Sequence, residues 1–117
     1  MAAPTFFGKG TLAAVATGSS ITPIAFPANI AANDIAVLGV GCNGSSTFTT
    51  PNGQGAWSLL GTSLESDAGQ STEWYWLRLT GSEASESVAA SAVFSGTVGG
   101  YGQPFVFRGA TPTGNPF

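Results

Sequence analysis

The sequence predicts an all-β fold, an antiparallel β-sandwich of jelly-roll-like type, in a single domain. Glycine accounts for 17 of the 117 residues, and Gly, Ser and Thr are weak helix formers. Short apolar runs alternate with turns rich in Gly, Pro and Asn, which is typical of antiparallel strands. We expect the sandwich to cover residues 1–109. Residues 110–117 contain two prolines and are expected to form an extended C-terminal arm.

The first expected strands lie before residue 27. A Thr-Phe-Phe-Gly opening at Thr5 is followed by a weakly alternating strand over residues 11–17. Gly18-Ser19-Ser20 predicts a turn. A second extended piece covers residues 21–26, where Pro23 fits an edge position because proline cannot donate to a β-ladder.

Residues 34–42 form the most continuous apolar run and predict a central strand. Within this run, Gly39 and Gly41 leave room for another backbone or for a large ring. An indole from the strand over residues 72–80 is the natural occupant. Cys42 lies in the same run, and we expect it to be a small buried apolar group, because a lone cysteine cannot form an intrachain disulfide.

The strand expected over residues 72–80 has large apolar groups on both faces, and the rest of the prediction is organised around it. On one face, period two places Tyr75, Leu77 and Leu79. On the other face it places Trp74, Trp76 and Arg78. A strand of this type is either central to a sandwich or lies where a second surface docks.

Three further strands are expected, over residues 56–64, 88–95 and 104–109. Trp57 in the first of them and Tyr101 further along are each either a core or contact aromatic or part of a sugar-binding surface, and burial in the core is favoured for Trp57. Gly99-Gly100-Tyr101-Gly102 is expected to be a flexible link between the last two strands.

Charge is scarce in this sequence. Only 8% of the residues are charged, against roughly 25% in typical soluble domains. The cations are Lys9, Arg78 and Arg108, too few to neutralise phosphates, so we expect no nucleic-acid binding. No apolar run of about 18 residues is present, so we expect no membrane insertion. A surface this poor in charge favours an assembly in which neighbouring molecules cover it.

No catalytic constellation is visible. Histidine is absent, which removes the usual general base near neutral pH and, with a single cysteine, the ligands of a zinc site. Asp34 precedes a strand but lacks the D-x-D spacing of a calcium loop. A carboxylate pair for glycoside cleavage is disfavoured, because the acids lie in or beside polar turns and are expected to be solvated. These acids are Glu65, Asp67, Glu73, Glu83 and Glu86. We therefore expect no enzyme, no cofactor and no metal.

Three short motifs resemble a β-sandwich module of bacteriophage virion proteins and related actinobacterial proteins. Residues 56–61, A-W-S-L-L-G, are similar to its G-W-x-L-L strand, with alanine in place of glycine. Residues 74–78, W-Y-W-L-R, resemble its aromatic strand that ends in a basic residue. Residues 107–113, F-R-G-A-T-P-T, are similar to its Y-R-G-V-D-P-T ending, with phenylalanine for tyrosine and threonine for aspartate. The resemblance spans residues 34–117 and implies a particle component without enzymatic activity.

On these grounds we expect a non-enzymatic structural protein of a phage-like virion, either a capsid decoration protein or a tail or fibre subunit. Its expected partners are further copies of itself, in a homo-oligomer, and other virion proteins such as a capsid or tail protein. Its expected location is the virion, after assembly in the host cytoplasm. Aromatic residues and arginine are the usual anchors of protein interfaces. The expected contact residues are therefore Trp74, Trp76, Arg78 and Phe117.

The alternative is a carbohydrate-binding module or adhesin tip that binds a host-surface glycan. Side chains two apart on a strand stand about 7 Å from each other. Trp74 and Trp76 would then form a flat platform for sugar rings, with Arg78 donating hydrogen bonds at one end. The same spacing would instead let Arg78 stack on Trp76 as a cation–π pair. Exposed indoles would favour the glycan alternative, and a stable oligomer would favour assembly.

Overall fold

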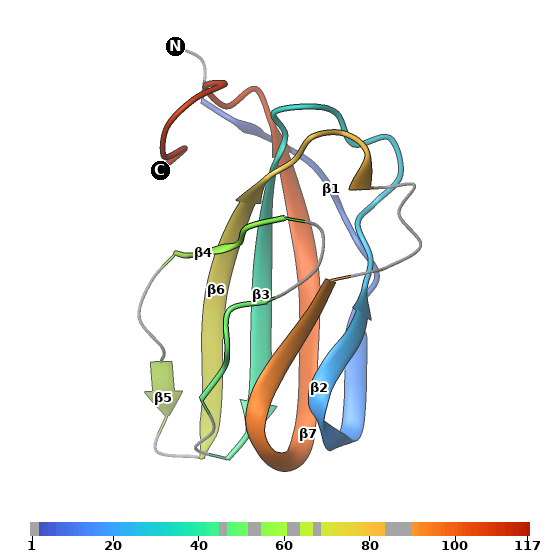
Figure 1. Ribbon diagram of the computed structural model, residues 1–117, viewed down its shortest axis with the longest axis vertical. Coiled ribbons are helices and arrows are strands. Elements are labelled where there is room, and N and C mark those ends of the chain that lie inside the picture. Colours follow the sequence, from blue (N-terminus) through green and yellow to red (C-terminus); the bar gives the residue numbers. More distant parts are fainter. Residues whose placement is uncertain (1–2, 45–46, 52–54, 61–63, 67–68, 84–89) are drawn as a thin grey trace.

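The computed structural model describes residues 3–44, 47–51, 55–60, 64–66, 69–83 and 90–117. These residues form an all-β, antiparallel domain, as predicted (Figure 1). The described strands are β1 (Thr5–Lys9), β2 (Ala13–Ile24), β3 (Ile35–Asn43), β4 (Ser58–Leu59), β5 (Leu64–Ser66), β6 (Gln70–Arg78) and β7 (Ala90–Arg108). They are hydrogen-bonded in the order β1-β7-β3-β6-β4, with β2 beside β7 and β5 beside β6. None of the described segments is a helix with the length and hydropathy needed to cross a bilayer.

Strand β3 is central, as predicted, with β6 on one side and β7 on the other. In register, Leu38 lies between Tyr75 of β6 and Pro104 of β7. Alternate residues of β3 point into the core, because successive side chains of a strand lie on opposite faces. The inward residues, all buried, are Ala36, Leu38, Val40 and Cys42.

Strand β7 contributes to both layers of the sandwich. Its last part, from Gly100 to Phe107, pairs with β3. Its first part, from Ala90 to Val98, pairs with β2. Figure 1 shows β2 and β7 turning back together at the lower end of the view, so that their other halves lie over the main sheet. The second layer is therefore made by bending two long strands rather than by adding separate ones.

Two predicted strand ends are wrong for this reason. The sequence predicts a turn at residues 18–20 and a flexible link at residues 99–102, but β2 and β7 run through these positions. The β2–β7 pairing changes register on both sides of Gly18. A Cβ on Gly99 would lie 3.1 Å from the carbonyl oxygen of Ala16. Glycine here allows close approach and bending within a strand, which local sequence does not distinguish from a turn.

Residues 61–63 of the strand predicted over residues 56–64 lie outside the described part of the chain. Among its described residues, Ser58–Leu59 (β4) and Leu64, the first residue of β5 (Leu64–Ser66), pair with β6, and the Leu60 N–H donates to the Trp74 carbonyl oxygen. Trp57 is buried, as predicted, and stacks on Phe26 with ring centroids 6.0 Å apart. Of the strand predicted over residues 88–95, the first two residues lie outside the described part of the chain.

An ion pair closes the end of the sheet where β3 begins and β7 ends. Arg108 donates from Nε and Nη2 to Asp34 at 2.9 and 2.7 Å. Its Nη2 also donates to the Asn29 carbonyl oxygen, and its guanidinium lies 3.9 Å from the ring centroid of Phe7. Burial tends to raise the pKa of Asp34, but the hydrogen bonds from Arg108 and the Ala31 N–H hold that pKa below its ordinary value of 3.8. Asp34 is thus a structural carboxylate.

Glu83 corrects the prediction that the loop acids are solvated. It is buried and accepts hydrogen bonds from the N–H and hydroxyl of Thr80 and from the N–H of Gly81, at 2.7–2.9 Å. These donors outweigh burial, which tends to raise the pKa, and hold the pKa of Glu83 below its ordinary value of 4.5. Asp67 and Glu86 lie outside the described residues. The acids and the cysteine of the described segments form no group of three that could hold a metal ion.

Candidate functional site

Strand β6 presents the two faces that its sequence predicts. Tyr75 and Leu77 are buried, and so is Leu79 just beyond the strand. On the outer face Trp74 is 43% exposed. Of the four predicted contact residues, the structure brings three together near the C-terminal arm: Trp76, Arg78 and Phe117. Trp74 instead lies with residues of β3 and β7, so the outer face carries two separate sites.

The first site, which we call the arm site, comprises Trp76, Arg78, Phe117 and the apolar residues around Phe117. Arg78 holds the arm by donating to the carbonyl oxygens of Thr111 and Gly114, at 2.6 and 3.0 Å. Gly109 and Gly114 have φ angles of +91° and +79°, which glycine adopts without steric cost. The arm therefore turns back toward the sheet (Figure 1). The Arg78 guanidinium therefore binds the arm and does not stack on Trp76.

The arm site is apolar and strongly exposed. Phe117 packs edge-on against Trp76, with ring centroids 6.2 Å apart, and is still 63% exposed. Phe6 of β1, 59% exposed, makes a similar edge contact with Phe107. A hollow of about 220 Å³ opens here, lined by Pro4, Ile35, Phe107, Pro116 and Phe117.

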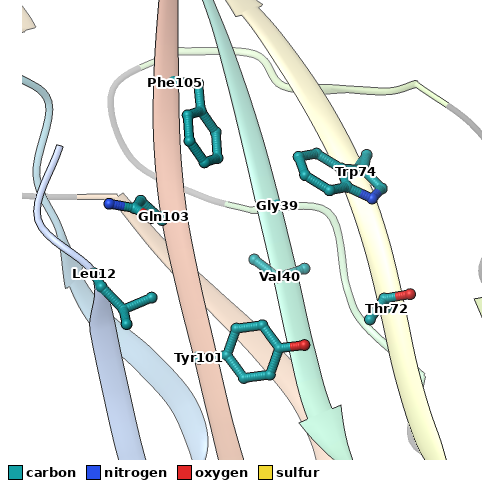
Figure 2. Close-up of a pocket in the computed structure, with 8 residues that line it drawn as sticks. All are labelled: Leu12, Gly39, Val40, Thr72, Trp74, Tyr101, Gln103 and Phe105. Carbon is teal, nitrogen blue, oxygen red and sulfur yellow. The ribbon is translucent and has the colours of Figure 1, made fainter. Parts of the chain in front are cut away.

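The second site, which we call the aromatic hollow, lies further along the same outer face (Figure 2). Its volume is about 340 Å³. All of its lining residues are uncharged, and they come from β3, β6, β7 and the segment before β2. They are Leu12, Gly39, Val40, Thr72, Trp74, Tyr101, Gln103 and Phe105.

Two glycines of β3 form the floor beneath the rings of the hollow. A Cβ on Gly39 would lie 2.8 Å from the Trp74 indole, and a Cβ on Gly41 would lie 2.5 Å from the Tyr101 ring. The predicted indole over these glycines is confirmed at Gly39, whereas Gly41 receives Tyr101. In register, Trp74 faces Gly39 from β6 and Tyr101 faces Gly41 from β7. The two rings therefore reach across β3 from opposite sides.

Polar groups lie beside the rings. Gln103 donates from Nε2 to the Gly10 carbonyl oxygen at 2.9 Å, which fixes the orientation of its amide. Thr72 lies opposite Gly41 in register. Phe105 packs against Trp74 with ring centroids 6.4 Å apart and extends the apolar wall.

Sequence reasoning missed the β7 side of the hollow. Tyr101, Gln103, Phe105 and Phe107 alternate with period two, which is the pattern of one strand face. The prediction of a flexible link at residues 99–102 hid this pattern. It let the last strand begin only at residue 104, so Tyr101 and Gln103 were not assigned to a strand face.

The described side chains that line the two sites include no carboxylate and no thiol. Apart from the Arg78 guanidinium, which is bound to the arm, these sites offer apolar contact, ring stacking and hydrogen bonds from neutral groups. Comparisons with protein-family models, with curated proteins and with solved structures gave no significant match to this chain.

Proposed function

We propose that this chain is a non-enzymatic structural subunit of a phage-like virion, a capsid decoration protein or a tail or fibre subunit, that acts through protein–protein contacts. The arm site is the observation that carries the proposal. Two phenylalanines, Phe6 and Phe117, are more than half exposed beside an apolar hollow. Exposed apolar groups gathered around a hollow are typical of surfaces that contact another protein. The resemblance of three motifs to phage virion proteins supports a location in a virus particle.

The anchoring of the arm fits a contact role. Arg78 binds the arm through main-chain carbonyl oxygens, so the arm's side chains are left to face a neighbour. Residues 112–115 are exposed along their whole length. Interface cores are poor in charge and rich in aromatic residues and arginine, as this end of the molecule is. The proposed partners are further copies of the chain and other virion proteins, such as a capsid or tail protein.

Light scattering over a concentration series tests self-association directly. We expect a closed oligomer for the wild-type chain. The double variant Phe6→Ser/Phe117→Ser is expected to shift the mass toward the monomer, because it makes the arm site polar. Leu12→Ser, an exposed apolar residue of the aromatic hollow, is the matched control and is expected to leave the mass unchanged. A wild-type chain that stays monomeric at every concentration contradicts self-assembly.

A separate measurement tests whether the chain is a component of virus particles. Peptide mass spectrometry of sedimented, nuclease-treated particles from the source culture is expected to detect the chain at a stoichiometry comparable with other shell proteins. Recovery of the chain only from the soluble fraction contradicts a virion role.

Glycan binding on a Trp74–Trp76 platform is the second candidate function. The exposed indole of Trp74 favours it. Phe117 packs on Trp76, however, so one half of that platform already has an occupant from the chain itself.

A further inference from the structure

We propose that the aromatic hollow binds a neutral glycan, with sugar rings stacked on Trp74 and Tyr101 rather than on Trp74 and Trp76. This inference does not rest on the virion role, because none of the residues of the arm site lines the hollow.

The orientation of the two rings is the first ground. Because Gly39 and Gly41 have no side chains, the rings of Trp74 and Tyr101 settle onto the backbone of β3. Figure 2, which looks onto the sheet, shows the Tyr101 ring nearly face-on and the Trp74 indole obliquely, neither of them edge-on. Trp74 and Tyr101 are 43% and 46% exposed, so a ligand can reach their ring faces. A flat ligand can stack on such faces, whereas edge-on rings would offer only their rims.

The spacing of the rings is the second ground. Gly39 and Gly41 are two residues apart on β3, which separates their Cα atoms by about 7 Å, and the two rings approach these glycines from β6 and from β7. An oligosaccharide lying across β3 can therefore contact both rings. The hollow of about 340 Å³ lies within the range of roughly 300–1,000 Å³ that is usual for small-ligand sites.

The polar groups around the rings are the third ground. A pyranose has apolar C–H faces and a rim of hydroxyl groups. The hollow has the matching arrangement: two ring faces bordered by the Thr72 hydroxyl and by the Gln103 amide, which Gly10 holds in place. The Tyr101 hydroxyl and the Trp74 Nε1–H add one hydrogen-bonding group each at the ring edges. The lining residues carry no charge, which favours a neutral sugar over an acidic one.

The comparison with the arm site favours a sugar over a second protein copy. The hollow beside Phe117 has only apolar walls, which suit a protruding apolar side chain of another protein molecule. The aromatic hollow instead combines flat, open rings with several hydrogen-bonding groups, which a buried protein side chain would leave unpaired at a cost.

Isothermal titration with a set of neutral hexasaccharides tests the proposal. The probes are cellohexaose, laminarihexaose, maltohexaose, mannohexaose and chitohexaose, each with tryptophan emission recorded in parallel. We expect at least one probe to bind with a dissociation constant of about 0.1–1 mM. Trp74→Ala and Tyr101→Ala are each expected to weaken that binding at least about tenfold, as removal of a central aromatic anchor does. Phe6→Ala, an exposed aromatic of the arm site, is the matched control and is expected to bind as the wild type does.

Two glycine variants test the ring geometry itself. Gly39→Ala is expected to lift the Trp74 indole, and Gly41→Ala the Tyr101 ring, because each new Cβ would lie within 2.8 Å of ring atoms. Both should weaken glycan binding while every contact group remains present. Tyr101→Phe keeps the ring face and is expected to bind better than Tyr101→Ala. Urea denaturation of each variant confirms that it is folded.

Three results would overturn the proposal. The first is that no probe binds at concentrations up to about 10 mM. The second is binding that survives both Trp74→Ala and Tyr101→Ala. The third is that Trp74→Ala changes the mass of the protein in solution and leaves sugar binding intact, which would assign the hollow to a second copy of the chain.

Discussion

The two faces of the β3–β6 sheet are built from alternate residues of the same strands, yet they are used differently. The inner face holds Leu38 and Tyr75, both fully buried. The outer face holds Trp74, which is larger and is 43% exposed. A tryptophan would contribute much to a core if it were buried there. Its place on the outer face, where none of the described strands forms a second layer over it, is typical of a residue that contacts another molecule.

The difference between the faces extends to how space on β3 is filled. On the inner side the strand fills its own space with Leu38 and Val40. On the outer side Gly39 and Gly41 leave the space to rings from β6 and β7. The inner face is therefore closed by its own side chains, whereas the outer face depends on rings that a ligand can reach.

A pair of identical substitutions gives the largest expected difference between the faces. Leu38→Ala on the inner face is expected to lower the free energy of unfolding by about 3 kcal/mol, because it leaves a cavity in the core. Leu12→Ala on the outer face, at an exposed leucine, is expected to change it by less than about 0.5 kcal/mol. Urea denaturation measures both. Equal losses would mean that the aromatic hollow belongs to the core.

Acid is expected to destabilise the fold by protonating the two buried carboxylates, Asp34 and Glu83. The pKa values of Asp34 and Glu83 lie below their ordinary values of 3.8 and 4.5. Each group therefore stabilises the fold fully above its ordinary pKa, and that stabilisation is lost as the pH falls through the lower value of the folded state. We expect the melting temperature to be nearly constant from pH 7 to about pH 5 and to fall below about pH 4.

Glu83→Gln provides the control for this pH dependence. It is expected to lower the free energy of unfolding by about 1–2 kcal/mol at pH 7, since hydrogen bonds to a carboxylate are stronger than those to an amide. Its loss of stability in acid should be shallower than that of the wild type. A wild-type profile that stays flat down to pH 2 would contradict the assigned roles of both acids.

Only a small effect on stability is expected at the arm. Arg78→Met removes both hydrogen bonds to the arm carbonyls, one partly buried and one exposed, and is expected to lower the free energy of unfolding by about 1 kcal/mol. Acrylamide quenching of tryptophan should rise, because Phe117 no longer shields Trp76. Lys9→Met, which removes another exposed cation without touching the arm, should leave quenching unchanged. A loss of several kcal/mol in Arg78→Met would show instead that the arm is part of the folded core.

Local sequence patterns were enough to predict which face each residue of β6 occupies and which strand is central. Alternation assigned Tyr75 and Leu77 to one face and Trp74 to the other, and the apolar run at residues 34–42 marked the central strand. The bends of β2 and β7 were not predictable, because glycine at a bend and glycine at a turn look alike until the partner strand is known. Tyr101 was misplaced for that reason, and with it half of the aromatic hollow.

The ion pair was hidden for a related reason. Asp34 and Arg108 are 74 residues apart, and nothing in the sequence around either one points to the other. The sequence predicts a solvated acid at Glu83, because it does not show that the N–H groups that hold this carboxylate come from a turn whose geometry depends on Gly81 at φ +95°.

The place of β7 in the sheet also governs how the chain reaches its native state. Strand β7 pairs with β1, β2 and β3, although it follows all three along the chain. Thr5 and Arg108, which pair in register, are 103 residues apart. Such distant pairings require large loops to close. The entropy of loop closure is lost before the new contacts stabilise the chain, so we expect slow folding for a domain of this size. Until β7 docks, β3 has an open edge and an uncovered apolar face, so aggregation competes with folding during that interval.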